Sequence, residues 1–174
     1  EVFAEFIRLC DEAAGACALH GPGGALARYE GLRKKLRANP LVFADGTRFS
    51  YDMLISQTNL ALCTPETWRD FAQALAMLAD AADGQAGMAD QARAVLRRIG
   101  ERINEVQPPR ADYDNSLDAN RSVTCSDSDF PRFFEAYSAV GTYAERGSFL
   151  GPYWWWPQAS CGAWPETPTQ SARW

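Results

Sequence analysis

The segment YDMLISQTNLALCTPETWRDFAQALAMLADAADG, residues 51–84, decides the fold class. Tyr51 to Leu62 predicts one helix, and Thr64-Pro65-Glu66 predicts the start of another, because Thr caps exposed amides, Pro suits the first helical position and Glu complements the helix dipole. The second helix has an apolar stripe made of Trp68, Phe71, Ala72, Leu75, Leu78 and Ala82. Such a stripe is typical of helix packing, so we predict a helical core.

Both neighbouring regions continue this pattern. A helix is predicted over Glu1 to Ala14, a second one ends at Ala38 before Pro40, and a third begins near Met88 and stops at Pro108-Pro109. Their predicted inward faces are Val2, Phe3, Phe6, Ile7 and Cys10; Leu26, Tyr29, Leu32 and Leu36; and Met88, Ala92, Val95, Leu96, Ile99 and Ile103. The stretch LVFADGTRFS, residues 41–50, predicts a small hairpin around Asp45-Gly46, too small to form a sheet-based core.

The pattern changes after Ala111 to predicted loops, with one short helix around Phe130 to Val140 that carries Phe133, Phe134 and Tyr137. Alternating strand and helix units, as in a hydrolase or nucleotide-binding core, are absent from the sequence pattern. The predicted fold is therefore mainly α, with a small hairpin and no hydrolase sheet. We expect a helical domain at residues 1–140 and an irregular, disulfide-tied, aromatic and Pro-rich tail at 141–174.

Five cysteines allow at most two internal disulfides. As a hypothesis, Cys10 and Cys17 close a short loop and Cys125 and Cys161 a long one, while Cys63 is a buried free thiol in an apolar stretch. This pairing favours an exported protein. Zinc binding is the competing use of cysteine, but the chain has no C-x-x-C pair and one histidine, so we predict no metal and no cofactor.

Composition limits the classes of partner. The formal net charge of −5 disfavours nucleic acid, and no apolar run reaches the roughly 20 residues of a membrane-spanning helix. The chain begins Glu1-Val2-Phe3, without an initiator Met or the features of a signal peptide. We therefore expect it to be part of a longer protein.

Few residues suggest catalysis. The elbow G-x-S-x-G that exposes a nucleophilic serine is missing, and GSFLG at 147–151 has the wrong order. His20 lies beside a Gly-Pro turn, where we expect a solvated or capping side chain. Asp127 and Asp129 are either paired carboxylates or caps of the helix predicted from Phe130.

Four segments in order resemble the tripeptidyl-aminopeptidase-like branch of the α/β-hydrolases: FIRLCDEAAGACAL at 6–19, residues 51–84, ANRSVTCSDSD at 119–129 and SCGAWP at 160–165. These are exported bacterial serine hydrolases. The resemblance implies that the chain is the helical lid inserted into the hydrolase fold. It also implies that the serine lies upstream and the acid and histidine downstream, so that no catalytic residue is present.

A lid of this kind implies an α/β-hydrolase core as partner and a pocket for a short peptide or a hydrophobic ester. Cys10, Cys17, Cys125 and Cys161 match the family's landmarks. Cys63 departs from them, because it stands where the family usually has an aromatic or aliphatic residue.

The stretch GPYWWWPQASCGAWP, residues 151–165, supplies the predicted contact residues. Trp154, Trp155 and Trp156 pack against the absent core or contact substrate, together with Tyr153, and we add Asp127 and Asp129 as substrate-binding candidates; Trp164 we expect to pack. Three consecutive side chains cannot all face one direction. We therefore expect at least one exposed indole in an apolar patch, which also permits self-association.

Two other functions stay open from the sequence. The chain is alternatively an independent helical module that binds peptides or hydrophobic ligands through its Trp-rich tail. A third hypothesis is an enzyme that uses Asp127, Asp129 or His20.

Overall fold

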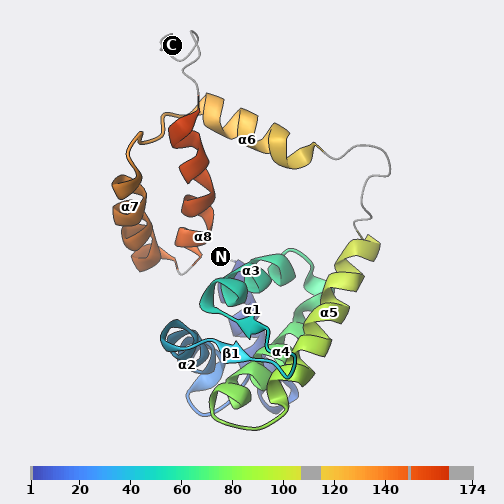
Figure 1. Ribbon diagram of the computed structural model, residues 1–174. Coiled ribbons are helices and arrows are strands. Elements are labelled where there is room, and N and C mark those ends of the chain that lie inside the picture. The colour runs from blue at the N-terminus through green and yellow to red at the C-terminus, as the bar shows by residue number, and fades with distance from the viewer. Residues whose placement is uncertain (1, 107–114, 149, 165–174) are drawn as a thin grey trace. The chain divides into compact units, whose positions relative to one another are not determined.

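The computed structural model describes residues 2–106, 115–148 and 150–164, and Figure 1 shows its elements. The described chain is mainly helical with one small antiparallel hairpin, which confirms the predicted fold class. It forms two compact units, Glu1–Pro108 and Pro109–Trp174. The predicted boundary at 140/141 differs from this division, because it falls inside a helix that belongs wholly to the second unit.

Unit 1 is built around α4, which packs against α5 and α2. The unit consists of α1 Val2–Ala13, η1 Ala14–Ala16, α2 Gly24–Ala38, β1 Leu41–Val42, β2 Arg48–Phe49, α3 Tyr51–Leu62, η2 Pro65–Thr67, α4 Trp68–Ala82 and α5 Met88–Val106. The α4 stripe is buried at Phe71, Ala72, Leu75 and Leu78, as its spacing predicts. The stretch that decides the fold class therefore supplies the centre of the unit 1 core.

The start of α4 differs from the prediction in its chemistry. Pro65–Thr67 forms a short 3-10 turn, and the side chain of Thr64 makes no capping hydrogen bond. Instead, the hydroxyl of buried Thr67 donates to the carbonyl of Thr64 at 2.8 Å, with the carbonyl of Ala61 at 3.2 Å. The turn is thus tied to the end of α3 rather than to the first amides of α4.

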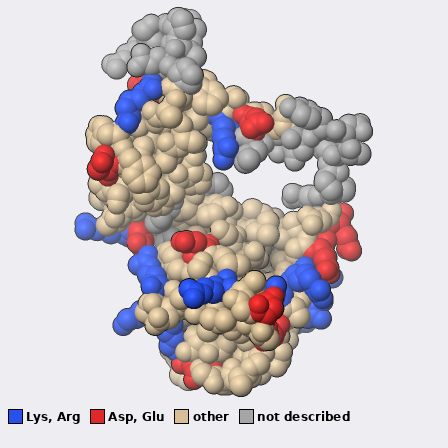
Figure 2. All heavy atoms as spheres, viewed as in Figure 1, with Lys and Arg blue, Asp and Glu red and all other residues tan. Residues whose placement is uncertain are grey.

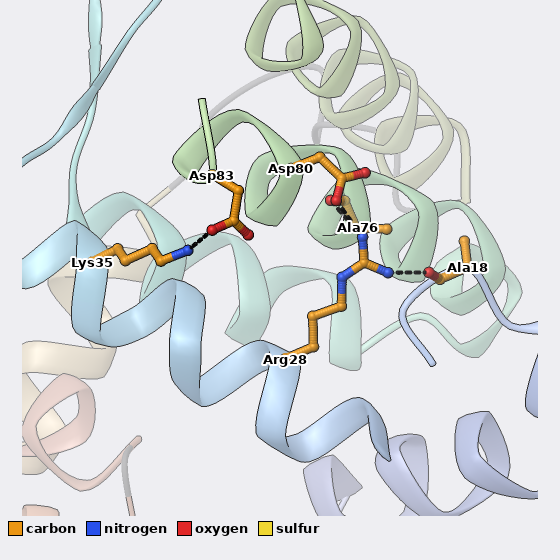
Figure 3. Close-up of polar contacts among 6 residues, drawn as sticks. All are labelled: Ala18, Arg28, Lys35, Ala76, Asp80 and Asp83. Atoms are coloured by element: carbon orange, nitrogen blue, oxygen red, sulfur yellow. Dashed lines mark hydrogen bonds and ion pairs between the residues drawn. The ribbon is translucent and has the colours of Figure 1, made fainter. Parts of the chain in front are cut away.

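Arg28 and Lys35 reach from α2 to two carboxylates at the C-terminal end of α4: Asp80 in its last turn and Asp83, the residue that follows it (Figure 3). The Arg28 guanidinium donates to Asp80 Oδ1 at 2.5 Å, to the carbonyl of Ala18 at 2.9 Å and to that of Ala76 at 3.4 Å. Lys35 pairs with Asp83. These contacts fix the position of α2 along α4.

The hairpin forms where the sequence predicts it. Leu41 pairs with Phe49 and Val42 with Arg48, across a turn that contains Asp45 and Gly46. Gly46 has φ 82°, a conformation that glycine adopts without steric cost. Phe43 and Phe49 are both buried, which anchors the hairpin to unit 1.

Unit 2 contains more helix than the sequence pattern suggests. Its elements are α6 Ser116–Asp127, α7 Phe134–Gly147, α8 Gly151–Trp155 and η3 Trp156–Ala163. The expectation of loops after Ala111 was wrong for α6, whose one buried side chain among those described, Cys125, gives no helical stripe. The tail was predicted to be irregular, but residues 151–163 are helical, and the Cys125–Cys161 disulfide ties them to α6.

Several predicted core positions face solvent instead. Leu26 is exposed and Ala25 takes its place in the core of α2. Val2 is also exposed. Of the aromatic residues noted around α7, Phe133 and Phe134 are exposed and Tyr137 is buried. Helical spacing alone does not choose between adjacent apolar residues, so these positions depended on packing partners distant in sequence.

Candidate functional site

Unit 2 carries an exposed aromatic pair, Phe134 and Trp156. Their ring centroids are 5.6 Å apart, and the two residues are 65% and 39% exposed. Phe133, which precedes α7, is exposed as well. The expectation of at least one exposed indole among the three consecutive tryptophans is therefore met at Trp156.

Trp155 is half-buried and makes several contacts. Its indole Nε1 donates to the carbonyl of Tyr137 at 3.0 Å, and its ring lies 5.2 Å from the Tyr137 ring and 6.5 Å from that of Phe130. Tyr153 is half-buried, whereas the side chain of Trp154 lies outside the described residues. Among the predicted contact residues whose side chains the structure describes, Trp156 is thus the exposed indole.

Gly141 permits the close packing of α8 and η3 on α7. A Cβ at this position would lie 3.3 Å from Trp156 Nε1 and 3.6 Å from Trp155 Cδ1. Both indoles therefore pack over the glycine. The missing side chain brings Trp156 close to the α7 backbone while its outer part stays exposed.

The disulfides and Trp164 complete the frame of this site. The structure contains both predicted disulfides, Cys10–Cys17 in unit 1 and Cys125–Cys161 in unit 2. Trp164 is half-buried, and its backbone carbonyl accepts from Arg132 Nη1 at 2.7 Å. The Cys125–Cys161 disulfide therefore fixes η3, which carries Trp156, to α6.

Asp127 and Asp129 do not cap α7 as the sequence suggested. Asp127 is the last residue of α6, and α7 begins only at Phe134. The residue in the capping position of α7 is Phe133, and no side chain makes a capping hydrogen bond there. Both carboxylates are exposed, and neither has a hydrogen bond or ion pair to another described residue. They remain candidates for substrate contact only, and nothing in their geometry pairs them.

Cys63 differs from the prediction of a buried thiol. It is free but exposed, at the end of α3, and its Sγ lies 3.4 Å from the carbonyl of Asn59. Apolar neighbours in the sequence suggested burial. The residue instead falls on the outer side of the last helical turn.

His20 takes part in a local polar arrangement. Its Nδ1 lies 3.0 Å from Asp11 Oδ1, and the same oxygen accepts from the backbone N–H of Ala25 at 2.7 Å. Both contacts lower the pKa of the Asp11 carboxyl, and the hydrogen bond from Ala25 has the larger effect. Asp11 therefore satisfies the first turn of α2, and His20 supports it, which agrees with a structural role.

Three further observations concern surface charge, metal ligands and helix hydrophobicity in the described part of the chain. On the visible face of unit 1, basic and acidic side chains are interspersed (Figure 2). Within residues 2–106, 115–148 and 150–164, no group of three or more His, Cys, Asp or Glu side chains is arranged to hold a metal ion. Nor does any described helix combine the length and hydrophobicity required to cross a bilayer.

No model of a known protein family, no characterised protein and no solved structure matches the chain.

Proposed function

We propose that this chain is the lid of a serine α/β-hydrolase of the tripeptidyl-aminopeptidase-like class. The parent protein is exported from a bacterium and cleaves a short peptide or a hydrophobic ester. In this proposal the lid covers the active site and shapes the substrate pocket, and all three catalytic residues belong to the hydrolase core.

The observation that carries the proposal is the exposed aromatic pair of Phe134 and Trp156. Two large rings in contact at a surface keep apolar area in water, and such area is typical of a surface that a partner or ligand covers. Because η3 is tied to α6 by the Cys125–Cys161 disulfide, the pair is held on a fixed frame rather than on a free terminus. A rigid apolar wall of this kind suits a lid.

The ordered segments give a second line of support. Two of them, around Cys125 and Cys161, are joined covalently, and another contains both partners of the Cys10–Cys17 disulfide. The mainly helical architecture with a two-stranded hairpin is also the kind expected of a lid. Two disulfides are compatible with an extracellular location.

The first experiment tests catalysis by the chain alone. The purified protein is treated with a fluorophosphonate probe for serine hydrolases and examined by intact mass, with and without reductant. We expect no adduct and two reductant-sensitive disulfides. A stoichiometric adduct would place a reactive serine in this chain and overturn the proposal.

The second experiment tests the lid role directly. The chain is added to a serine α/β-hydrolase core of the same class from which the lid has been deleted, and cleavage of tripeptide and ester substrates is measured. We expect the chain to bind the core and change kcat/KM. A Phe134→Ala/Trp156→Ala variant should lose this effect, whereas Val123→Ala, at an exposed apolar position of α6, should retain it. Equal behaviour of the two variants would remove the aromatic pair from the proposal.

The same aromatic pair also favours the alternative of an independent binding module. The two functions differ in what the isolated chain does. Saturable binding of apolar peptides by the chain alone, lost on Trp156→Ala and unaccompanied by any effect on a hydrolase core, would establish the module instead of the lid.

A further inference from the structure

A cavity of about 660 Å³ lies in unit 1 between the hairpin, α3 and α5. Its apolar lining includes Phe43, Phe49, Met53 and Leu96, and its polar lining includes three arginines, Arg48, Arg93 and Arg97. This volume is within the range of small-molecule sites, about 300–1,000 Å³. The cavity therefore combines an apolar floor with a cationic rim.

One of the three arginines is already occupied. The Arg93 guanidinium pairs with Asp45 and lies over the Phe43 ring, 4.9 Å from its centroid. The one acidic side chain in the lining, Asp90, accepts a hydrogen bond from the backbone N–H of Ala44 at 3.1 Å. These contacts attach the hairpin to α5 and hold that wall of the cavity in place.

Arg48 and Arg97 are differently placed. Arg48 is exposed on β2 and has no acidic group within 4 Å among the described residues. Arg97 is 76% exposed and meets Glu101 at 3.7 Å, a spacing typical of a surface pair worth only a few tenths of a kcal/mol. A ligand anion can therefore take the place of Glu101 as the partner of Arg97 at little cost in free energy, and pair with Arg48 as well.

We propose that this cavity binds a monocarboxylate with an apolar chain, such as a medium-chain fatty acid. The carboxylate pairs with Arg48 and Arg97, since guanidinium groups bind carboxylates through charge-assisted hydrogen bonds. The chain lies on Phe43, Met53 and Leu96.

Sodium decanoate, 1-decanol and decylammonium are titrated into the full chain by calorimetry. Because decanol shares the apolar chain and lacks the charge, we expect decanoate to bind at least tenfold more tightly and decylammonium not to bind. Arg48→Gln/Arg97→Gln should weaken decanoate binding at least tenfold. Arg98→Gln is the matched control, since Arg98 is an exposed α5 arginine outside the cavity lining, and it should leave binding unchanged.

A peptide Ala-Leu-Leu with a free or an amidated C-terminus distinguishes the source of the carboxylate. Binding of the free acid alone, without decanoate, would assign the cavity to peptide C-termini while keeping the carboxylate site. Equal binding of decanoate and decanol, no binding of any carboxylate, or an unchanged affinity in the correctly folded double variant would overturn the proposal. The titration needs no hydrolase core, so its outcome is independent of the lid function proposed above.

Discussion

Gly162 shows how a single residue sets the packing of unit 2. A Cβ at this position would lie 2.7 Å from the carbonyl oxygen of Pro131 and 3.3 Å from the Tyr137 hydroxyl. That hydroxyl in turn donates to Pro131 O at 3.1 Å, next to the Cys125–Cys161 disulfide. The close approach between η3 and the segment before α7 therefore depends on the absence of a side chain.

We expect Gly162→Ala to destabilise unit 2 by about 1–3 kcal/mol, because the added methyl group must displace backbone. Gly147→Ala is the matched control, since a Cβ there meets no atom within 4 Å. Urea unfolding followed by tryptophan fluorescence measures both changes. Equal midpoints for the two variants would contradict the packing argument.

Asp45 makes stability depend on pH. Hydrogen bonds from Thr47, followed by the Arg93 guanidinium, hold the pKa of this carboxyl well below its usual range. The unfolded chain therefore takes up the proton first as the pH falls below about 4. Asp45 thus contributes stability above that pH and loses this contribution as the pH falls toward its folded-state pKa.

Asp45→Asn should lower stability at pH 7 and flatten the dependence of the unfolding midpoint on pH between about 4 and 2. Asp129→Asn is the control, because that carboxylate makes no hydrogen bond to a described residue. Chemical unfolding at a series of pH values measures the effect. A slope in Asp45→Asn as steep as in the unchanged protein would rule out Asp45 as its source.

The burial or exposure of individual side chains was the feature least predictable from the sequence. The sequence predicted inward positions for Val2 and Leu26, both of which are exposed, and burial for the thiol of Cys63, which is exposed. Each lies next to another apolar residue in the sequence, so local spacing gave no basis for choosing which of the two is buried. For the exposed Phe133 and Phe134, the available signal was the sequence FPRFF, residues 130–134, since three large rings at the start of one helix cannot all face a small core.

At the scale of elements, the contact between α2 and α4 is held by two ion pairs of different burial (Figure 3). The side chains of Arg28 and Asp80 are 25% and 31% exposed, and those of Lys35 and Asp83 are 44% and 61% exposed. Arg28 also donates to two backbone carbonyls, which Lys35 does not match. The first pair should therefore contribute more than the second.

We expect Asp80→Ala to destabilise unit 1 by about 1–2 kcal/mol, since it removes a charge-assisted bond in a partly buried site. Asp83→Ala should cost less than about 0.5 kcal/mol, as typical exposed pairs do. A double-mutant cycle of Arg28→Met with Asp80→Ala separates the pair energy from the lost packing. Equal costs for the two aspartate variants would show that burial does not distinguish the pairs.

Helices with a regular apolar stripe were predicted correctly, and α6, which lacks one, was not. The helices α1 to α5 follow the sequence pattern closely because each buries a regular face. α6 lacks such a face: it is attached through Cys125, and its other described side chains are largely exposed. A helix that depends on one covalent anchor leaves no periodic signal.

At the scale of the whole molecule, the two disulfides should have separable effects. Cys125–Cys161 spans 36 residues and Cys10–Cys17 spans 7, so the chain-entropy model gives about 4 and about 2.5 kcal/mol of stabilisation, respectively. We expect Cys125→Ser/Cys161→Ser to unfold unit 2 at temperatures where unit 1 stays folded. Cys10→Ser/Cys17→Ser should leave unit 2 unchanged.

Fluorescence and amide exchange distinguish these outcomes. Trp68 is the one tryptophan in unit 1, and the other five belong to unit 2, so emission reports chiefly on unit 2. Protected amides of α4 report on unit 1. Loss of protection in α4 on removal of Cys125–Cys161 would show that the units fold as one.

The candidate site was predictable in part. The tryptophan run and the cysteine pairs were visible in the sequence, and the rule that three consecutive side chains cannot face one direction led to an exposed indole. Which indole it would be depended on Gly141 and on the hydrogen bond from Trp155 to Tyr137. These contacts join residues 14 to 18 positions apart, beyond the reach of helical spacing.

Each disulfide joins two cysteines of the same unit, Cys10–Cys17 in unit 1 and Cys125–Cys161 in unit 2, and the fifth cysteine is free. The peptide backbone between residues 106 and 115 is therefore the one covalent connection between the two units. A single cut there would release two fragments that separate on a gel without reductant. For the same reason, genetic recombination can exchange either unit as a whole without separating the two cysteines of a disulfide.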